Sequence, residues 1–202
     1  MGEVSASLVG FGTKFFGYDN DSNLDIFVAN GDVQEFMDPT TRKSIYPQRD
    51  HLYCGNGDGT YTEVSASSGK YFSDKYVGRG TAFGDYDNDG DIDILVFNCN
   101  QSVILLRNDG GNANNWLTVK LIGTRSNRDG IGARIRLTTG REVRIAEVQS
   151  AASYLSANDL RVIFGLGGKK IVDKIEVHWP SGAKQTLNDV RANQLIKITE
   201  QI

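Results

Sequence analysis

The chain has 202 residues, 39% of them hydrophobic, and a formal net charge of −3. This length allows one or two domains, and the chain lacks the basic stripe that is typical of nucleic-acid-binding proteins. No apolar run approaches the roughly 20 residues of a membrane span. The start MGEVSASLVGFG lacks the basic and long apolar segments of a signal peptide, so we expect a cytosolic chain or a trimmed piece of an exported protein.

Short runs rich in Val, Ile, Leu, Phe and Tyr follow one another, separated by Gly, Asn and Asp, which is typical of β-strands. The sequence therefore predicts an all-β protein. The clearest strands are DIFVANG (25–31), DILVFN (93–98), SVILLRN (102–108), WLTVKLIG (116–123), ARIRLTTG (133–140), EVRIAEV (142–148), RVIFGLG (161–167), KIEVHW (174–179) and QLIKITE (194–200).

The first half repeats itself. FFGYDNDSNLDIFVANG matches AFGDYDNDGDIDILVFN when Tyr18 is aligned with Tyr86, an offset of 68 residues. A β-propeller blade takes about 40–50 residues, and we assign the excess to an inserted loop at 31–50. The NGDG stretch at 56–59 predicts a hairpin turn. Residues 1–113 therefore read as a partial β-propeller of about two blade-like units.

The second half, residues 114–202, has no acidic loop and no repeat. Its seven or so short strands favour a small β-sandwich or barrel. We place the domain boundary in NDGGNANN, just before residue 114. Trp116 and Trp179 are expected in the core of this second domain.

An acidic loop opens one of the predicted strands, with five aspartates in nine residues. Carboxylates about 5 Å apart repel by roughly 3 kcal/mol per pair at an effective dielectric near 20, so a counter-charge is expected. A D-x-D-x-D-G start brings alternate oxygens together around Ca²⁺. Asp85, Asp87 and Asp89 would supply side chains, Asp91 its backbone carbonyl, and Asp93 the closing ligand.

This loop is not an EF-hand, because its twelfth residue is Val96 rather than Glu and strands flank it. The alternative is a solvated turn without an ion. The repeat places a second candidate loop earlier in the chain, but Gly17 stands where the acidic loop has Asp85, and Ser22 where it has Gly90. The candidate ligands there are Asp19, Asp21, Asn23 and Asp25.

Other candidate features are weaker. Cys54 and Cys99 match no metal or redox motif and form either a disulfide or two buried thiols. Neither His51 nor His178 sits in a nucleophile motif. Alternation predicts an arginine face, with Arg134, Arg136, Arg141 and Arg144 outward and Ile135, Leu137, Val143 and Ile145 inward. A plain solvated face is the preferred interpretation, and a face that binds acidic glycans is the alternative.

The motifs carry a family resemblance. FGDYDNDGDIDI and GNGDGTYTEV resemble FG-GAP/VCBS repeats of extracellular β-propellers. NNWLTVKLIGTRSNRDGIGARIRL, RVIFGLG and KIEVHWPSGAKQTL resemble the ASPIC/UnbV domain, which commonly follows such repeats. The resemblance implies calcium in the 85–93 loop, and a weaker site in the first loop. It also implies a secreted or cell-surface protein without established catalytic chemistry.

The functional prediction is a calcium-binding, non-enzymatic extracellular module for adhesion or assembly. A carbohydrate-binding or carbohydrate-processing protein is the alternative. Even a four-bladed propeller needs roughly 160 residues, and only 113 precede the boundary. Open strand edges invite another strand. Either this chain is a fragment of a longer protein, or a neighbouring subunit or the C-terminal domain covers the edges. For a complete chain, we expect self-association with a second copy through strand addition.

Overall fold

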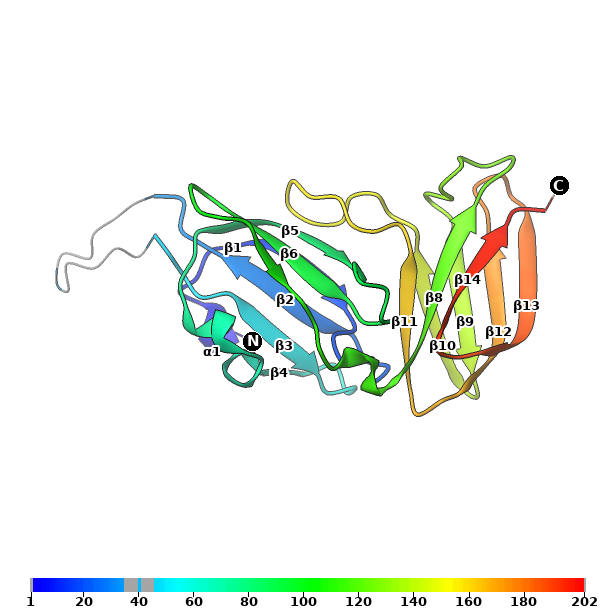
Figure 1. Cartoon of the computed structure of the whole chain (residues 1–202), viewed down its shortest axis with the longest axis horizontal. Coiled ribbons are helices and arrows are strands. Elements are labelled where there is room, and N and C mark those ends of the chain that lie inside the picture. Colours follow the sequence, from blue (N-terminus) through cyan, green and yellow to red (C-terminus); the bar gives the residue numbers. More distant parts are fainter. Residues whose placement is uncertain (1, 35–39, 41–45, 202) are drawn as a thin grey trace.

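The computed structural model describes residues 2–34, 40 and 46–201, so half of the insertion predicted at 31–50 lies outside the described residues. After a short helix α1 (Gly2–Ser5), the regular secondary structure of the described residues consists of β-strands and three short 3-10 turns. Two sheets occupy the N-terminal part and two the C-terminal part, placed end to end (Figure 1). The predicted all-β class is confirmed. No helix in the described part of the chain is long and apolar enough to cross a membrane.

The N-terminal part holds the two repeated units. The first sheet has the order β1-β2-β3-β4, with strands β1 (Gly10–Phe16), β2 (Asp25–Asn30), β3 (His51–Gly55) and β4 (Tyr61–Glu63). The second sheet has the order β5-β6-β7, with strands β5 (Gly78–Gly84), β6 (Asp93–Asn98) and β7 (Ile104–Leu106). Two 3-10 turns, η1 (Ser65–Ser67) and η2 (Lys70–Ser73), lie between the two sheets in the chain, and a third, η3 (Gly111–Ala113), follows β7.

The two N-terminal sheets stack through one apolar core. Phe16 and Phe27 of the first sheet meet Phe83 of the second, with ring centroids 5.2 and 6.3 Å apart. Leu52 and Val96 are buried in the same cluster. Strand alternation explains this core, because every second side chain of a strand faces the neighbouring sheet.

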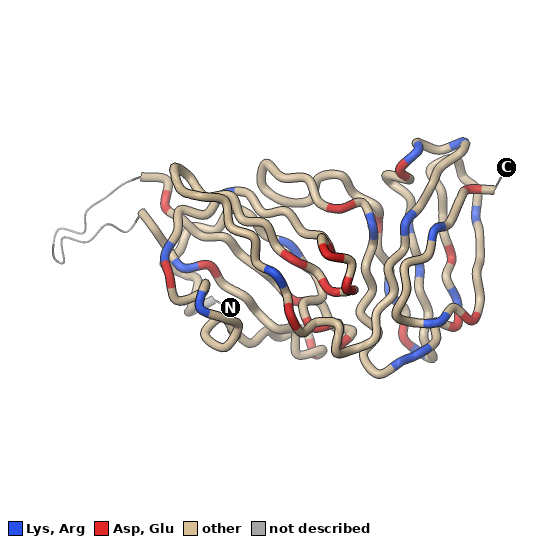
Figure 2. Tube along the Cα trace, viewed as in Figure 1, with Lys and Arg blue, Asp and Glu red and all other residues tan. Residues whose placement is uncertain are grey.

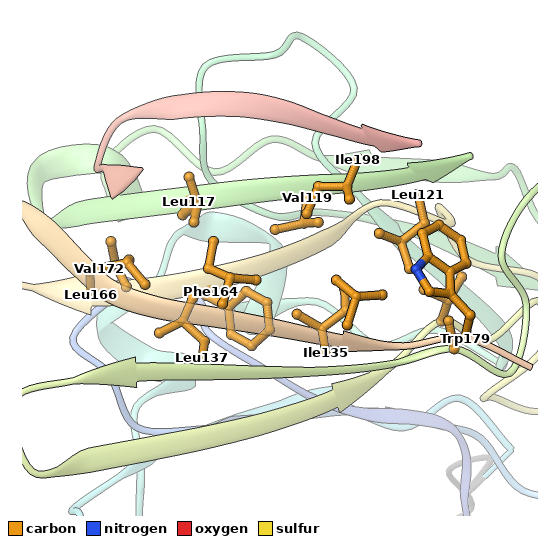
Figure 3. Close-up of a cluster of buried hydrophobic side chains, with 14 residues drawn as sticks. Leu117, Val119, Leu121, Ile135, Leu137, Phe164, Leu166, Val172, Trp179 and Ile198 are labelled. Carbon is orange, nitrogen blue, oxygen red and sulfur yellow. The ribbon is translucent and has the colours of Figure 1, made fainter. Parts of the chain in front are cut away.

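The C-terminal part is a sandwich, which we call the C-terminal sandwich. One sheet has the order β10-β9-β12-β13 and the other β11-β8-β14, with β14 parallel to β8. The strands are β8 (Asn115–Ile122), β9 (Arg134–Thr139), β10 (Glu142–Glu147), β11 (Val162–Gly167), β12 (Ile171–His178), β13 (Lys184–Arg191) and β14 (Gln194–Thr199). Their inward side chains form one core (Figure 3). Trp179 is buried there as predicted, whereas Trp116 is only half-buried.

A buried carboxylate fixes the loop between β8 and β9. Glu200 accepts backbone N–H bonds from Thr124 (2.9 Å), Arg125 (2.8 Å) and Ser126 (2.7 Å), and a hydroxyl bond from Ser181. Burial would raise the pKa of Glu200, but these hydrogen bonds outweigh it and lower the pKa to about 2. The chain end is thereby anchored to the loop at 123–131.

The orientation predicted for β10 is wrong. Val143 and Ile145 are 44% and 69% exposed, and Arg144 is the residue that turns inward, where it donates to the carbonyl of Gly165. Because β10 is an edge strand, alternation alone does not fix which of its faces is covered. The two cysteines, Cys54 and Cys99, are free thiols.

The C-terminal half covers the inner strand edges of both N-terminal sheets. Ser153 accepts the backbone N–H of Thr13 in β1 at 3.1 Å, and its hydroxyl contacts Thr81 of β5 at 2.9 Å. The Asn158 side chain accepts the N–H of Phe83 at 3.0 Å. At these two edges, which were predicted to be open, some of the backbone groups are therefore hydrogen-bonded within the chain.

We expect residues 114–202 to fold alone, because the core of the C-terminal sandwich draws only on residues between Leu117 and Ile198. An isolated fragment should give a β-type circular dichroism spectrum, a cooperative melt and the fluorescence of a buried Trp179. A disordered spectrum would contradict a domain boundary near residue 114.

Candidate metal centre

The loop between β5 and β6 brings three carboxylates together. One oxygen from each of Asp85, Asp87 and Asp89 lies within 4.8 Å of the others. Asp85 is buried, while Asp87 and Asp89 face solvent. The turn is built locally, because the Asp85 side chain accepts the backbone N–H of Asp89 (3.1 Å) and of Gly90 (3.2 Å). Gly90 has φ +101°, a conformation that glycine adopts without strain.

Asp93, predicted as the closing ligand, lies outside this group of three. Its two carboxylate oxygens accept backbone N–H bonds from Tyr86 (3.0 Å) and Asn108 (2.9 Å). Asp93 therefore ties the loop to the residues that follow β7. To serve as a ligand as well, it would have to share these oxygens with the ion.

Asp91 is fully buried beside the cluster. Burial raises the pKa of its carboxyl to about 7, helped by the charges of Asp89 and Asp93 and opposed by a bond from the Asn112 N–H. Its other oxygen has no hydrogen-bond partner among the described residues. The pKa of Asp85 is also raised by burial, with the Arg161 charge acting against the shift. The negative charge of these carboxylates is thus only partly balanced by positive charge at the site.

The first candidate loop shares the backbone hydrogen bonds of the acidic loop, but its carboxylates are arranged differently. Asp25 repeats the role of Asp93, accepting the N–H of Tyr18 (2.8 Å) and of Gly55 (2.9 Å), and burial raises its pKa to about 6. Asp21 accepts both the backbone and the side-chain N–H of Asn23 at 2.7 Å. Within the described part of the chain, Asp19, Asp21 and Asp25 do not form a group of three converging oxygens.

The acidic loop also docks on the C-terminal sandwich. Arg161, just before β11, donates to the Asn88 side chain (2.6 Å) and to the Asp85 carbonyl (2.5 Å). The Trp116 indole lies directly against Gly90, where a Cβ atom would come within 1.9 Å of the ring. Figure 2 shows acidic positions gathered where the N-terminal sheets meet the sandwich.

The two loops contact each other through Asn20. Its buried side-chain amide donates to the carbonyls of Gly90 (3.0 Å) and Gly111 (3.1 Å), and the backbone carbonyl of Asn20 accepts the N–H of Gly167 at 2.8 Å. Asn20 and Asn88 occupy equivalent positions at the 68-residue offset, and both have positive φ. That equivalence was visible in the sequence, whereas the roles of Asn20, Trp116 and Arg161 were missed.

Comparison with known proteins agrees with this architecture. Residues 17–96 match the FG-GAP-like repeat family, and residues 123–202 match the ASPIC and UnbV family. Cartilage acidic protein 1 of Homo sapiens is 28% identical over 189 residues, which cover 91% of this chain and 26% of the relative. The Mus musculus protein of that name is 27% identical, with 91% and 27% covered. The chain thus spans about a quarter of the length of these relatives.

Proposed function

The chain joins an FG-GAP-like repeat to an ASPIC/UnbV domain, and on that premise we propose that it is a calcium-binding, non-enzymatic extracellular module for adhesion or assembly. The convergence of Asp85, Asp87 and Asp89 carries the proposal. An all-oxygen donor set without nearby His or Cys suits Ca²⁺ rather than zinc. The ion would supply the positive charge that this loop otherwise lacks.

The extracellular location is supported by the relatives. Both are named for cartilage and for acidic character, and we extend that setting to this chain. The ion would then have a structural role, holding the loop against Trp116 and Arg161 and so joining the N-terminal sheets to the C-terminal sandwich.

A cavity of about 490 Å³ between the N-terminal sheets and the sandwich bears on the carbohydrate alternative. Its carboxylates are already paired, Glu147 with Arg134 at 3.3 Å and Asp159 with Arg161 at 2.5 Å. Arg136 is likewise paired, with Glu176 at 2.9 Å. These pairs neutralise much of the proposed arginine face, and they favour the non-enzymatic proposal over glycan processing.

The proposed partner is a protein, either a second copy or a neighbouring subunit. Strand addition was expected at open edges. The inner edges of β1 and β5 are partly covered, and the outer edge strands of the N-terminal sheets are β4 and β7, each three residues long. Edge strands this short are poor templates for strand addition, so the assembly surface is better sought on the faces of the sheets.

Calcium should raise the melting temperature. An ion that binds only the folded state stabilises it by about 2.7 kcal/mol at 100 times its dissociation constant, which corresponds to about 5–10 °C for a chain of this size. Asp87→Asn should remove most of this shift. Asp129→Asn, an exposed aspartate of the sandwich, is the matched control and should keep it. A melting temperature that ignores both calcium and chelator would contradict the proposal.

A further inference from the structure

The two N-terminal sheets carry the same four residues on one face, which we call the back face. In the first sheet, Thr13 pairs with Val28 and Phe15 with Ile26 across β1 and β2. In the second sheet, the pairs in β5 and β6 have the same residue types in the same register, and they are Thr81 with Val96 and Phe83 with Ile94.

The back face of the second sheet is a docking surface. Phe83 and Val96 are 3% and 0% exposed, because they pack on the opposite, front face of the first sheet, against Phe16 and Phe27. The two sheets therefore stack front to back, in a head-to-tail manner.

The back face of the first sheet has the same residues but no sheet to dock on within the described part of the chain. Phe15 is 57% exposed, although its equivalent Phe83 is almost fully buried. Thr13 is exposed and Val28 is partly exposed, while Ile26 is buried. The β1 side of this face, with Phe15 and Thr13, is thus exposed where the equivalent residues of the second repeat are buried, whereas Ile26 and its neighbour Tyr53 are buried.

The front face of the second sheet is the complementary surface. Ala82, Leu95 and Leu105 lie side by side across β5, β6 and β7. Leu105 is 47% exposed and Phe97 of the same face 51%. Gly84 stands where the first sheet has Phe16, and a hollow of about 320 Å³ opens beside it. Its lining includes apolar Ala82, Leu95 and Leu105 and charged Asp85, Asp93, Asp159 and Arg161. Asp159 lies against Gly84, where an added Cβ would come within 3.0 Å of its side chain.

We propose that the back face of the first sheet of one copy docks on the front face of the second sheet of another copy, with Phe15 entering the hollow beside Gly84. The contact repeats between molecules the stacking seen within one. It joins two different surfaces, so it builds rings or filaments rather than closed two-fold dimers. It refines the assembly part of the proposed function and needs no calcium, so its failure would leave the calcium response intact.

Sedimentation velocity over a concentration series tests this docking with one variant on each surface. The wild-type chain should form species larger than dimers as its concentration rises. Phe15→Glu and Leu105→Glu, both at exposed positions, should each be monomeric. An equal mixture of the two should form a 1:1 dimer and nothing larger, because only one intact back face and one intact front face remain. Val143→Glu, an exposed apolar residue of the sandwich, should assemble like the wild type.

Three results would overturn the proposal. They are a wild-type chain that stays monomeric at its solubility limit, single variants that assemble normally, and a mixture that stays monomeric. Circular dichroism and the calcium-induced melting shift verify that each variant is folded. If Phe15→Glu fails to fold, Phe15→Ser serves as the milder back-face variant.

Discussion

Asp93→Ala should destabilise the calcium-free protein by about 3–6 kcal/mol, because it removes two hydrogen bonds to a charged acceptor, each contributing about 1.5–3 kcal/mol. The lost bonds are those from the N–H groups of Tyr86 and Asn108. Asp87→Asn should leave calcium-free stability unchanged or slightly higher, because Asp87 is exposed and crowded by Asp85 and Asp89. Urea unfolding in the presence of chelator measures both effects.

With calcium present, the difference in the free energy of unfolding between the two variants should become smaller. Asp87→Asn loses the stabilisation by the ion, whereas Asp93→Ala keeps the three converging carboxylates but loosens their loop. Asp25→Ala in the first loop is the matched control for the loss of such hydrogen bonds, since Asp25 accepts the N–H groups of Tyr18 and Gly55 in the same way. If Asp87→Asn costs as much as Asp93→Ala without calcium, the division into structural and ion-binding aspartates is wrong.

Gly90→Ala should cost about 3 kcal/mol, the sum of an unfavourable positive φ and overpacking. Its Cβ would lie 1.9 Å from the Trp116 ring, so either the loop or the indole must move. The variant should also weaken the calcium response and alter Trp116 fluorescence, best recorded in a Trp179→Phe background. Urea unfolding and emission spectra provide the measurements.

Gly59→Ala is the control for backbone strain alone. Gly59 has φ +86° and nothing within 4 Å of its added Cβ, so about 1 kcal/mol is expected there. Combining Gly90→Ala with Trp116→Ala should recover part of the loss, because the clash disappears. Equal costs at Gly59 and Gly90 would contradict the packing of Trp116 on the acidic loop.

The sequence predicted those features that depend on neighbours along the chain. Strand alternation, the NGDG turn and the aspartate spacing are local, so the strands and the convergence of Asp85, Asp87 and Asp89 followed from them. The interface could not be predicted in this way. Arg161 and Asn88 are far apart in the sequence, as are Trp116 and Gly90, and only the stacking of the sheets on the sandwich brings them together.

Two local patterns gave incomplete answers for the same reason. The spacing placed Asp93 in the ligand set, but the N–H of Asn108 comes from beyond β7 and engages one of its oxygens. Alternation in β10 was real, yet the contact of Arg144 with Gly165 on the facing sheet turned the arginine inward and left Ile145 exposed. In both cases a partner distant in the sequence decided the orientation.

Isothermal titration of the calcium-free chain with Ca²⁺ tests the central claim most directly. The wild type should bind one ion more tightly than any other. Asp87→Asn and Asp89→Asn should each abolish that first binding event, while Asp129→Asn should retain it. Two results would contradict a calcium site in the acidic loop. One is a wild type that gives no heat of binding, and the other is an unchanged heat of binding in Asp87→Asn and Asp89→Asn.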